Sequence, residues 1–218
     1  MKPYKIMLEI AGPTAMWTRP DTGDCPVSYP APTYSAVKGI FESVLWGPDV
    51  SIVPFKAEIC KPLHFHGYAT NYNGPLRKSG TEGAYQFLAT VLTDVCYRLY
   101  AHVYPVREKE RLPASAQKWD KKTTSPGHAY AAIFERRLKS GKWFTMPFLG
   151  WKEFTPAYLG PFREETLVET SINTVLPSMV REVFPDGYNS DRRFTYDQNV
   201  QIENGILHYR LQGQGGGK

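Results

Sequence analysis

The sequence predicts an α+β fold: a ferredoxin-like βαββαβ domain followed by a small β-rich subdomain. Three observations predict it. An early segment alternates apolar and polar residues, two amphipathic helical segments are separated by strand-like segments, and a hairpin signal lies near the carboxyl end. We expect the first domain at residues 1–160, the subdomain at 161–212 and a disordered glycine-rich tail at 213–218.

The first part of the chain predicts a strand, a helix and a second strand. Residues 2–10 alternate as a half-buried strand does. Thr33 can cap a helix whose apolar side chains recur at helical spacing until the Gly-Pro pair at 47–48. Residues 50–61 predict the second strand, with a break at Pro54 because proline donates no hydrogen bond to a sheet.

The middle of the chain supplies the remaining elements of the first domain. Residues 66–83 are rich in Gly, Asn, Ser and Thr and predict a surface excursion, whereas 95–103 alternate as a strand. Residues 107–127 predict a polar connector without secondary structure. A second helix is expected at 128–139, and a last strand at 148–158 completes the βαββαβ order.

The β-rich subdomain is predicted from its turn. Asn204-Gly205 separates two strand-like segments, 200–203 and 206–211, and this dipeptide is a strong signal for a hairpin.

Composition excludes several classes of protein. With 218 residues, 42% hydrophobic and 22% charged, the chain can build a core without disulfide or metal staples. Its three cysteines are widely spaced and predict neither a disulfide framework nor a zinc site. We find no signal-peptide core and no apolar run near the roughly 20 residues that span a bilayer. We therefore expect a soluble, cytoplasmic protein without a membrane partner.

Positive charge is concentrated in one stretch. Ten basic and four acidic residues lie between Arg107 and Lys142, so this stretch carries +6 in a chain of net charge +5. A localised positive segment is typical of a phosphate-binding surface, and 14% aromatic residues would suit the stacking of bases. A solvated loop and helix, with the aromatic residues in the core, is the competing interpretation.

Motifs of common enzymes and metal sites are absent. The sequence has no phosphate-binding P-loop, no Gly-x-Ser-x-Gly and no His-Glu-x-x-His. His64 and His66 would share one face of a strand, but no third ligand stands nearby, and acidic residues do not cluster as a two-metal nuclease requires. We expect neither a metal nor a small-molecule cofactor.

Residues of the basic stretch could support RNA cleavage without a metal. In that reaction the 2′-hydroxyl attacks the adjacent phosphate and leaves a cyclic phosphate and a 5′-hydroxyl. His128, where the basic loop meets a helix start, could exchange protons near neutral pH, and Lys122 could stabilise the transition-state charge. Tyr130 is a weaker acid, with an ordinary pKa of about 10. Alternatively, His128 caps the helix and Tyr130 packs beside Phe134.

Two motifs carry a resemblance to a known family. Residues 32–43 read PTYSAVKGIFES, with Trp46 following, and residues 133–138 and 147–154 read IFERRL and PFLGWKEF. Both motifs resemble those of the Cas-five subunit of type I-C CRISPR surveillance complexes, a RAMP protein of the d-subtype. The resemblance covers about residues 1–160.

The resemblance implies a RAMP fold and a function. Members of this family cut precursor CRISPR RNA within each repeat without a metal, keep the 5′ handle, and join the backbone and large subunits of a Cascade-type complex. Their catalytic tyrosine and Lys-His pair fall here on Leu45, Ala129 and Tyr130, so His128 lies two residues before the family's histidine position.

The same resemblance leads to candidate RNA contacts. Four basic residues could contact phosphates and two aromatic residues could stack on bases: Lys38, Arg136, Arg137 and Lys139, and Trp46 and Tyr34. Because Leu45 and Ala129 replace family residues, a structural Cascade subunit that binds processed RNA without cutting is one alternative. A generic RNA-binding module of the RNA-recognition type, outside CRISPR, is the other.

Overall fold

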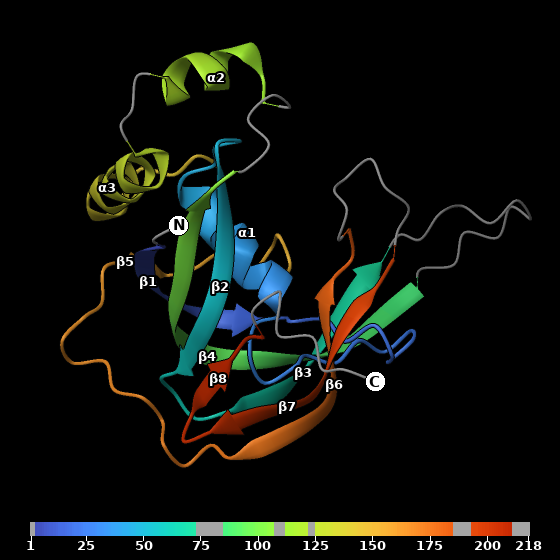
Figure 1. Ribbon diagram of the computed structural model, residues 1–218. Helices are drawn as coiled ribbons and strands as arrows, with labels where there is room; N and C mark the ends of the chain where they lie inside the picture. Colours follow the sequence, from blue (N-terminus) through green and yellow to red (C-terminus); the bar gives the residue numbers. More distant parts are fainter. Residues whose placement is uncertain (1–2, 73–84, 107–111, 122–124, 185–192, 211–218) are drawn as a thin grey trace, which may run out of the picture.

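The computed structural model describes residues 3–72, 85–106, 112–121, 125–184 and 193–210 (Figure 1). Its strands form one antiparallel sheet of eight strands in the order β5-β1-β4-β2-β8-β7-β6, and β3 pairs with β4 outside this path. In the described part of the chain, no helix is long and apolar enough to cross a membrane.

The first strand and helix are confirmed. Strand β1, Tyr4–Ala15, runs beyond the predicted end because its pairing with β4 continues as far as Ala15 and Leu92. Helix α1, Tyr34–Val44, begins after Thr33, whose side chain accepts a hydrogen bond from the Ala36 amide at 3.2 Å. The helix ends at Val44, before the predicted Gly-Pro stop, because the next residue takes an extended backbone.

Strands β2, Val50–Ile59, and β4, Tyr85–Pro105, confirm the two other central strands. The predicted break at Pro54 is a shift in the pairing register with β4, located between Pro54 and Lys56, so the strand continues through it. β4 is longer than predicted because its first half pairs with a strand that the sequence analysis assigned to a loop.

The predicted surface excursion is wrong at its beginning. Strand β3, His64–Tyr72, pairs antiparallel with the first half of β4, and the remainder, 73–84, lies outside the described residues. Most of its described side chains are exposed, so the sequence shows no apolar period, and pairing with β4 defines the strand.

The predicted connector also contains a helix. Helix α2, Ala114–Asp120, lies within it, and only Ala116 of its described side chains is buried, so the sequence shows no apolar period. Helix α3, Pro126–Lys139, confirms the second predicted helix and begins with a proline in its first turn.

The last strand of the first domain is displaced. Residues 148–157 turn rather than extend: Gly150 has a φ of 93°, and the Leu149 amide donates to the Phe154 carbonyl at 2.7 Å. Both of those apolar side chains are buried in the core. Strand β5, Tyr158–Gly160, is therefore short and pairs with β1 at the sheet edge.

The carboxyl-terminal part contains β6, Thr174–Glu182, β7, Thr195–Glu203, and β8, Ile206–His208. The predicted hairpin at Asn204-Gly205 is confirmed, with φ values of 50° and 74°. Because β8 also pairs with β2, the sheet continues without a break into this part of the chain. The tail at 213–218 lies outside the described residues.

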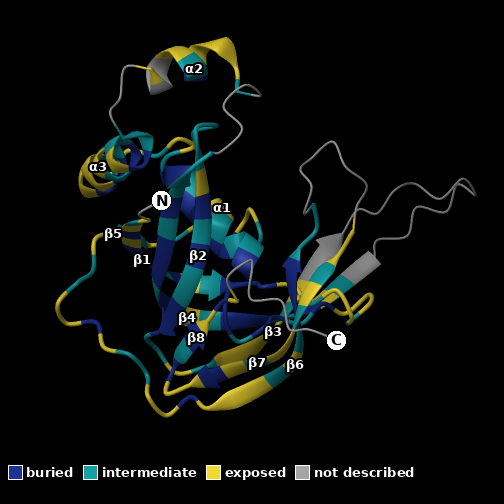
Figure 2. Cartoon of the chain, in the orientation of Figure 1, coloured by how far each residue is buried: buried dark blue, intermediate teal, exposed yellow. Residues whose placement is uncertain are grey.

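One core joins both helices to the sheet. Alternate residues of β4, among them Leu99 and Val103, are buried with residues of α1 and α3. The two helices meet through Phe41 and Phe134, whose ring centroids are 5.7 Å apart. Figure 2 shows buried residues along β1 and β4, and exposed residues on the outer side of α3 and on β6 and β7. The surface between α1 and α3 is thus built on a fixed core.

Candidate functional site

The end of α1 is held by side chains of α3. The last carbonyls of a helix have no partner within the helix. Here the Tyr130 hydroxyl donates to the Leu45 carbonyl, and Arg137 Nε donates to the Val44 carbonyl at 2.9 Å. The two family positions that the sequence analysis placed at Leu45 and Tyr130 are therefore in direct contact.

The loop after α3 folds back on the same helix end. The amides of Phe144 and Thr145 donate to the Ser43 carbonyl at 2.8 and 3.0 Å. The Phe144 ring then stacks on Trp46, with centroids 6.1 Å apart and planes 24° apart. This loop and α1 form the two walls of a groove.

This groove, which we call the aromatic groove, has a volume of about 450 Å³. Several of its large apolar side chains face solvent: Trp46 is 51% exposed, Phe144 57% and Met146 67%. Exposed apolar side chains that gather in one place mark a binding surface. Its lining residues are Trp17, Ser35, Ala36, Gly39, Ile40, Glu42, Ser43, Trp46, Phe144, Thr145, Met146, Pro147, Phe148 and Gly150.

Among the described residues that line the aromatic groove, Glu42 is the one with an acidic or basic side chain. Burial raises its pKa, and Lys38, one helical turn earlier, opposes that shift. Lys38 is itself half-buried on α1 and stands beside the groove rather than in its lining.

Two of the predicted phosphate contacts share one surface. Arg136 and Lys139 are exposed on the last turns of α3 and line a shallow hollow together with Glu135. Arg137 points the other way, toward the end of α1. Lys122, the fourth cation that the sequence analysis placed near this helix, lies outside the described residues.

His128 is exposed in the first turn of α3. Its ring meets the edge of the Tyr4 ring, with centroids 5.7 Å apart. The Ser125 hydroxyl at the helix cap contacts the Tyr4 hydroxyl at 3.0 Å and makes no capping bond. His128 therefore presents an imidazole to solvent at the start of α3.

Tyr130 is buried, and its ring stacks on Phe134 with centroids 6.4 Å apart. Burial raises its pKa far above the ordinary value, and the nearby charge of Glu42 adds to the rise. The packing interpretation of the sequence analysis matches this placement, and a role of Tyr130 in proton transfer stays a prediction.

Tyr34 is not brought to a stacking surface. It is buried, and the Arg181 guanidinium lies over its ring at 3.9 Å. Tyr209 meets its edge with centroids 6.0 Å apart. A base therefore finds no free face on Tyr34 in this arrangement.

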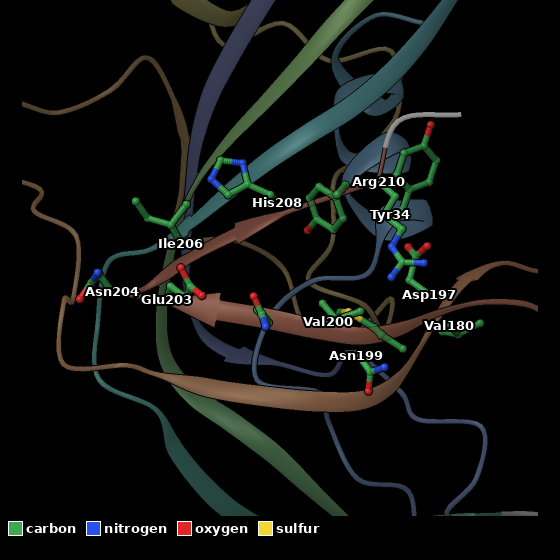
Figure 3. Close-up of a pocket in the computed structure, with 13 residues that line it drawn as sticks. Tyr34, Val180, Asp197, Asn199, Val200, Glu203, Asn204, Ile206, His208 and Arg210 are labelled. Atoms are coloured by element: carbon green, nitrogen blue, oxygen red, sulfur yellow. The ribbon is translucent and has the colours of Figure 1, made fainter. Parts of the chain in front are cut away.

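Tyr34 instead lines a second hollow, of about 380 Å³, between the start of α1 and strands β6, β7 and β8. In Figure 3, Tyr34, Asp197 and Arg210 lie toward one end of it, and Glu203 lies toward the β7–β8 turn. Asp197 is paired with Arg181 at 3.0 Å. The carboxylates of Asp197 and Glu203 both line this hollow. Their negative charge makes it less suited to a phosphate chain than the surface around α3.

His64 and His66 are both exposed on β3. Among the residues that the structure describes, no group of three or more His, Cys, Asp or Glu side chains could hold a metal ion.

Sequence reasoning missed the aromatic groove and Glu42. The signal was present in residues 143–149, WFTMPFL, where apolar side chains crowd a segment that carries a proline and lacks a strand period. We expected a strand only from residue 148 onward and assigned residues 143–147 to no element, so the apolar side chains of this loop were not recognised as a surface. Glu42 was overlooked because a single glutamate on a helix is ordinarily solvated.

The described residues thus include exposed stacked rings and a basic helix face, on an α+β scaffold with an antiparallel sheet. Aromatic platforms and basic surfaces are the two features by which proteins bind single-stranded nucleic acid. A family model described as "CRISPR-associated protein (Cas_Cas5)", of the Cas5d type, matches residues 5–210. This chain belongs to that family, the Cas-five family of the sequence analysis.

Two relatives are named CRISPR pre-crRNA endoribonuclease Cas5d. The protein from Mannheimia succiniciproducens is 27% identical over an alignment of 227 positions, and the alignment covers 93% of each chain. The protein from Thermus thermophilus is 29% identical over 161 residues, which cover 72% of this chain and 64% of that one.

Solved structures share the fold. A crystal structure described as that of a CRISPR-associated protein has a TM-score of 0.71 at 18% identity and covers 98% of this chain and 97% of its own. A functionally uncharacterized protein from Streptococcus mutans has a TM-score of 0.66 at 18% identity, with 97% and 94% covered.

Proposed function

We propose that this chain is the CRISPR RNA-binding subunit of a type I-C-like Cascade. It holds the 5′ handle of the CRISPR RNA and cuts precursor RNA within each repeat without a metal. Membership in the Cas5 family and the names of the two relatives support this function. The observation that carries it is the aromatic groove, at whose mouth the Trp46 and Phe144 rings stack and remain about half exposed.

The finer fold assignment belongs to the same proposal. The strand order β5-β1-β4-β2, with α1 after β1 and α3 after β4, fits a ferredoxin-like unit in residues 1–160 if β3 is an insertion. Residues 161–212 are then a β-rich subdomain attached through the pairing of β8 with β2.

RNA binding divides between two surfaces. The exposed indole of Trp46 can stack on a base in the aromatic groove. Arg136 and Lys139 can contact phosphates along α3, and Lys38 can contact a phosphate beside the groove. Arg137 and Tyr34 are less accessible because each is engaged inside the protein.

Cleavage needs proton transfer and stabilisation of charge. His128 is exposed at the start of α3 and can exchange a proton at the scissile phosphate, while Lys122 stabilises the negative charge of the transition state. The products are a 2′,3′-cyclic phosphate and a 5′-hydroxyl. The partners are the CRISPR RNA repeat and the Cascade backbone and large subunits, and the place of action is the cytoplasm.

The test is incubation of the purified protein in EDTA with its cognate CRISPR repeat RNA. We expect a single cut with a 5′-hydroxyl product, which His128→Ala abolishes and the control Lys121→Ala leaves in place. Cutting that persists in both His128→Ala and Lys122→Ala would remove these two residues from the mechanism.

A second function is favoured by the substitutions at the family positions. Leu45 and Ala129 carry no group that can transfer a proton. In that case the chain is a structural subunit that binds processed CRISPR RNA. Tight binding of the handle without any product after long incubation would decide for this function. Equal affinity for unrelated single strands would point to a generic RNA-binding module.

A further inference from the structure

The acidic side chain of Glu42 has an unusual place on α1. It lies in the last turn of the helix, and the chain turns into an extended conformation at Leu45 before it reaches Trp46. Both side chains line the aromatic groove. A nucleotide whose base stacks on Trp46 would bring its ribose and phosphate close to this carboxylate.

The surroundings of Glu42 favour a proton acceptor. Burial raises its pKa, which brings the group closer to the pH at which the protein works. Lys38, on the same helix, lowers the pKa of Glu42 but does not offset burial. From α3, Tyr130 and Arg137 face the same junction, and the charge of Glu42 raises the pKa of Tyr130. The lining residues 144–148 carry no charge.

We propose that Glu42 is the general base of RNA cleavage, a role that rests on the proposed function. The geometry points to it because, within the described part of the chain, its carboxylate is the one ionisable group that lines the aromatic groove, which is of nucleotide size and has exposed rings at its mouth. The residue at the family's tyrosine position, Leu45, is aliphatic, and the Tyr130 hydroxyl already donates to the Leu45 carbonyl.

The reaction balances without another reactant. The Glu42 carboxylate takes the proton of the ribose 2′-hydroxyl, and the 2′-oxygen forms a bond to the adjacent phosphorus. The bond from phosphorus to the 5′-oxygen breaks. The leaving oxygen takes a proton from His128, the exposed imidazole at the start of α3. The products are a 2′,3′-cyclic phosphate and a 5′-hydroxyl, and exchange with solvent returns both side chains to their starting states.

The experiment compares Glu42→Gln with the wild type on the repeat RNA in EDTA, under single-turnover conditions and with RNA affinity measured separately. We expect the cleavage rate to fall about 100-fold while the dissociation constant changes less than about twofold, because the amide keeps the size of the side chain. Glu164→Gln, an exposed glutamate in the loop after β5, is the matched control and should keep the full rate.

The pH profile separates catalysis from a structural role. A base must be deprotonated, so the wild-type rate should fall about tenfold per pH unit below the pKa of Glu42. This acid limb should remain in Glu42→Asp at a lower rate and disappear in Glu42→Gln. Equal rates and equal acid limbs in Glu42→Gln and wild type would overturn the inference while the proposed function stands. A wild type that binds the handle and never cuts would overturn cleavage and the inference together.

Discussion

Arg137 Nε donates a hydrogen bond to the Val44 carbonyl at 2.9 Å, so a cation of the basic stretch is used to close the end of α1. A hydrogen bond from a charged donor contributes more than a neutral one, and its loss leaves a carbonyl unpaired. We expect Arg137→Ala to lower the free energy of unfolding by about 2 kcal/mol, measured by urea denaturation.

Arg136→Ala is the control for this prediction. Arg136 is exposed on the neighbouring position of α3, so its removal should change the free energy of unfolding by less than about 0.5 kcal/mol. If Arg137→Ala is as stable as Arg136→Ala and binds RNA more weakly, Arg137 is a phosphate contact rather than a structural residue.

The exposed cations of α3 predict a change in salt dependence. Each phosphate contact releases counterions, so log affinity falls linearly with log salt. Arg136→Ala and Lys139→Ala should each lower the magnitude of that slope by about 1, measured by fluorescence anisotropy with the repeat RNA at several salt concentrations. Lys152→Ala, on an exposed turn, should leave the slope unchanged. Unchanged slopes in all three variants would place the RNA elsewhere.

Local chemistry predicted the parts of the fold that depend on neighbouring residues. Thr33 caps α1, and Asn204-Gly205 forms the hairpin, because capping and tight turns need only a few adjacent residues. Strand β3 and the short β5 depend instead on partners distant in the sequence. No local period marks them, since the pairing strand supplies their hydrogen bonds.

The residues of the candidate site, like the elements of the fold, were predicted only in part. Positive charge and the family resemblance together singled out Arg136 and Lys139, which do share one surface. Neither could separate them from Arg137, because a guanidinium that caps a neighbouring helix looks the same in a sequence. Tyr34 is engaged by Arg181, which comes from strand β6 far along the chain. Such tertiary contacts decide which of several aromatic or basic residues stays free.

We expect removal of the Trp46 side chain to lower RNA affinity without lowering the free energy of unfolding. Its side chain is half-exposed and packs on Phe144, which is itself exposed. Base stacking on an aromatic side chain contributes about 1–3 kcal/mol, so Trp46→Ala should weaken RNA binding by about 5- to 150-fold. Trp46→Phe should retain most of the affinity. Phe65→Ala removes an exposed ring of β3 and should have no effect. Equal losses in Phe65→Ala and Trp46→Ala would argue against stacking in the groove.

The ionisation of Glu9 should make the free energy of unfolding depend on pH, independently of RNA binding. Its carboxylate is fully buried on β1 and accepts hydrogen bonds from Arg163 Nε at 2.6 Å and Thr166 Oγ1 at 2.8 Å. Burial alone would raise the pKa of Glu9, but these hydrogen bonds outweigh it and the pKa lies below the ordinary 4.5. The carboxylate therefore stabilises the fold above its unfolded pKa, and this contribution is lost as the pH falls through the folded pKa.

Glu9→Gln tests that linkage. At pH 7 the variant should lose about 3 kcal/mol of unfolding free energy, because Arg163 keeps a charge without its partner. The difference from wild type should narrow as the pH falls below the ordinary carboxyl pKa of 4.5, because Glu9 then takes up a proton in the unfolded chain while the folded protein keeps its carboxylate charged until the pH falls further. Urea denaturation at pH 7, 5 and 3.5 measures it, with the exposed Glu164→Gln as the control. A constant difference at all three pH values would mean that Glu9 stabilises the sheet through its shape and not through its charge.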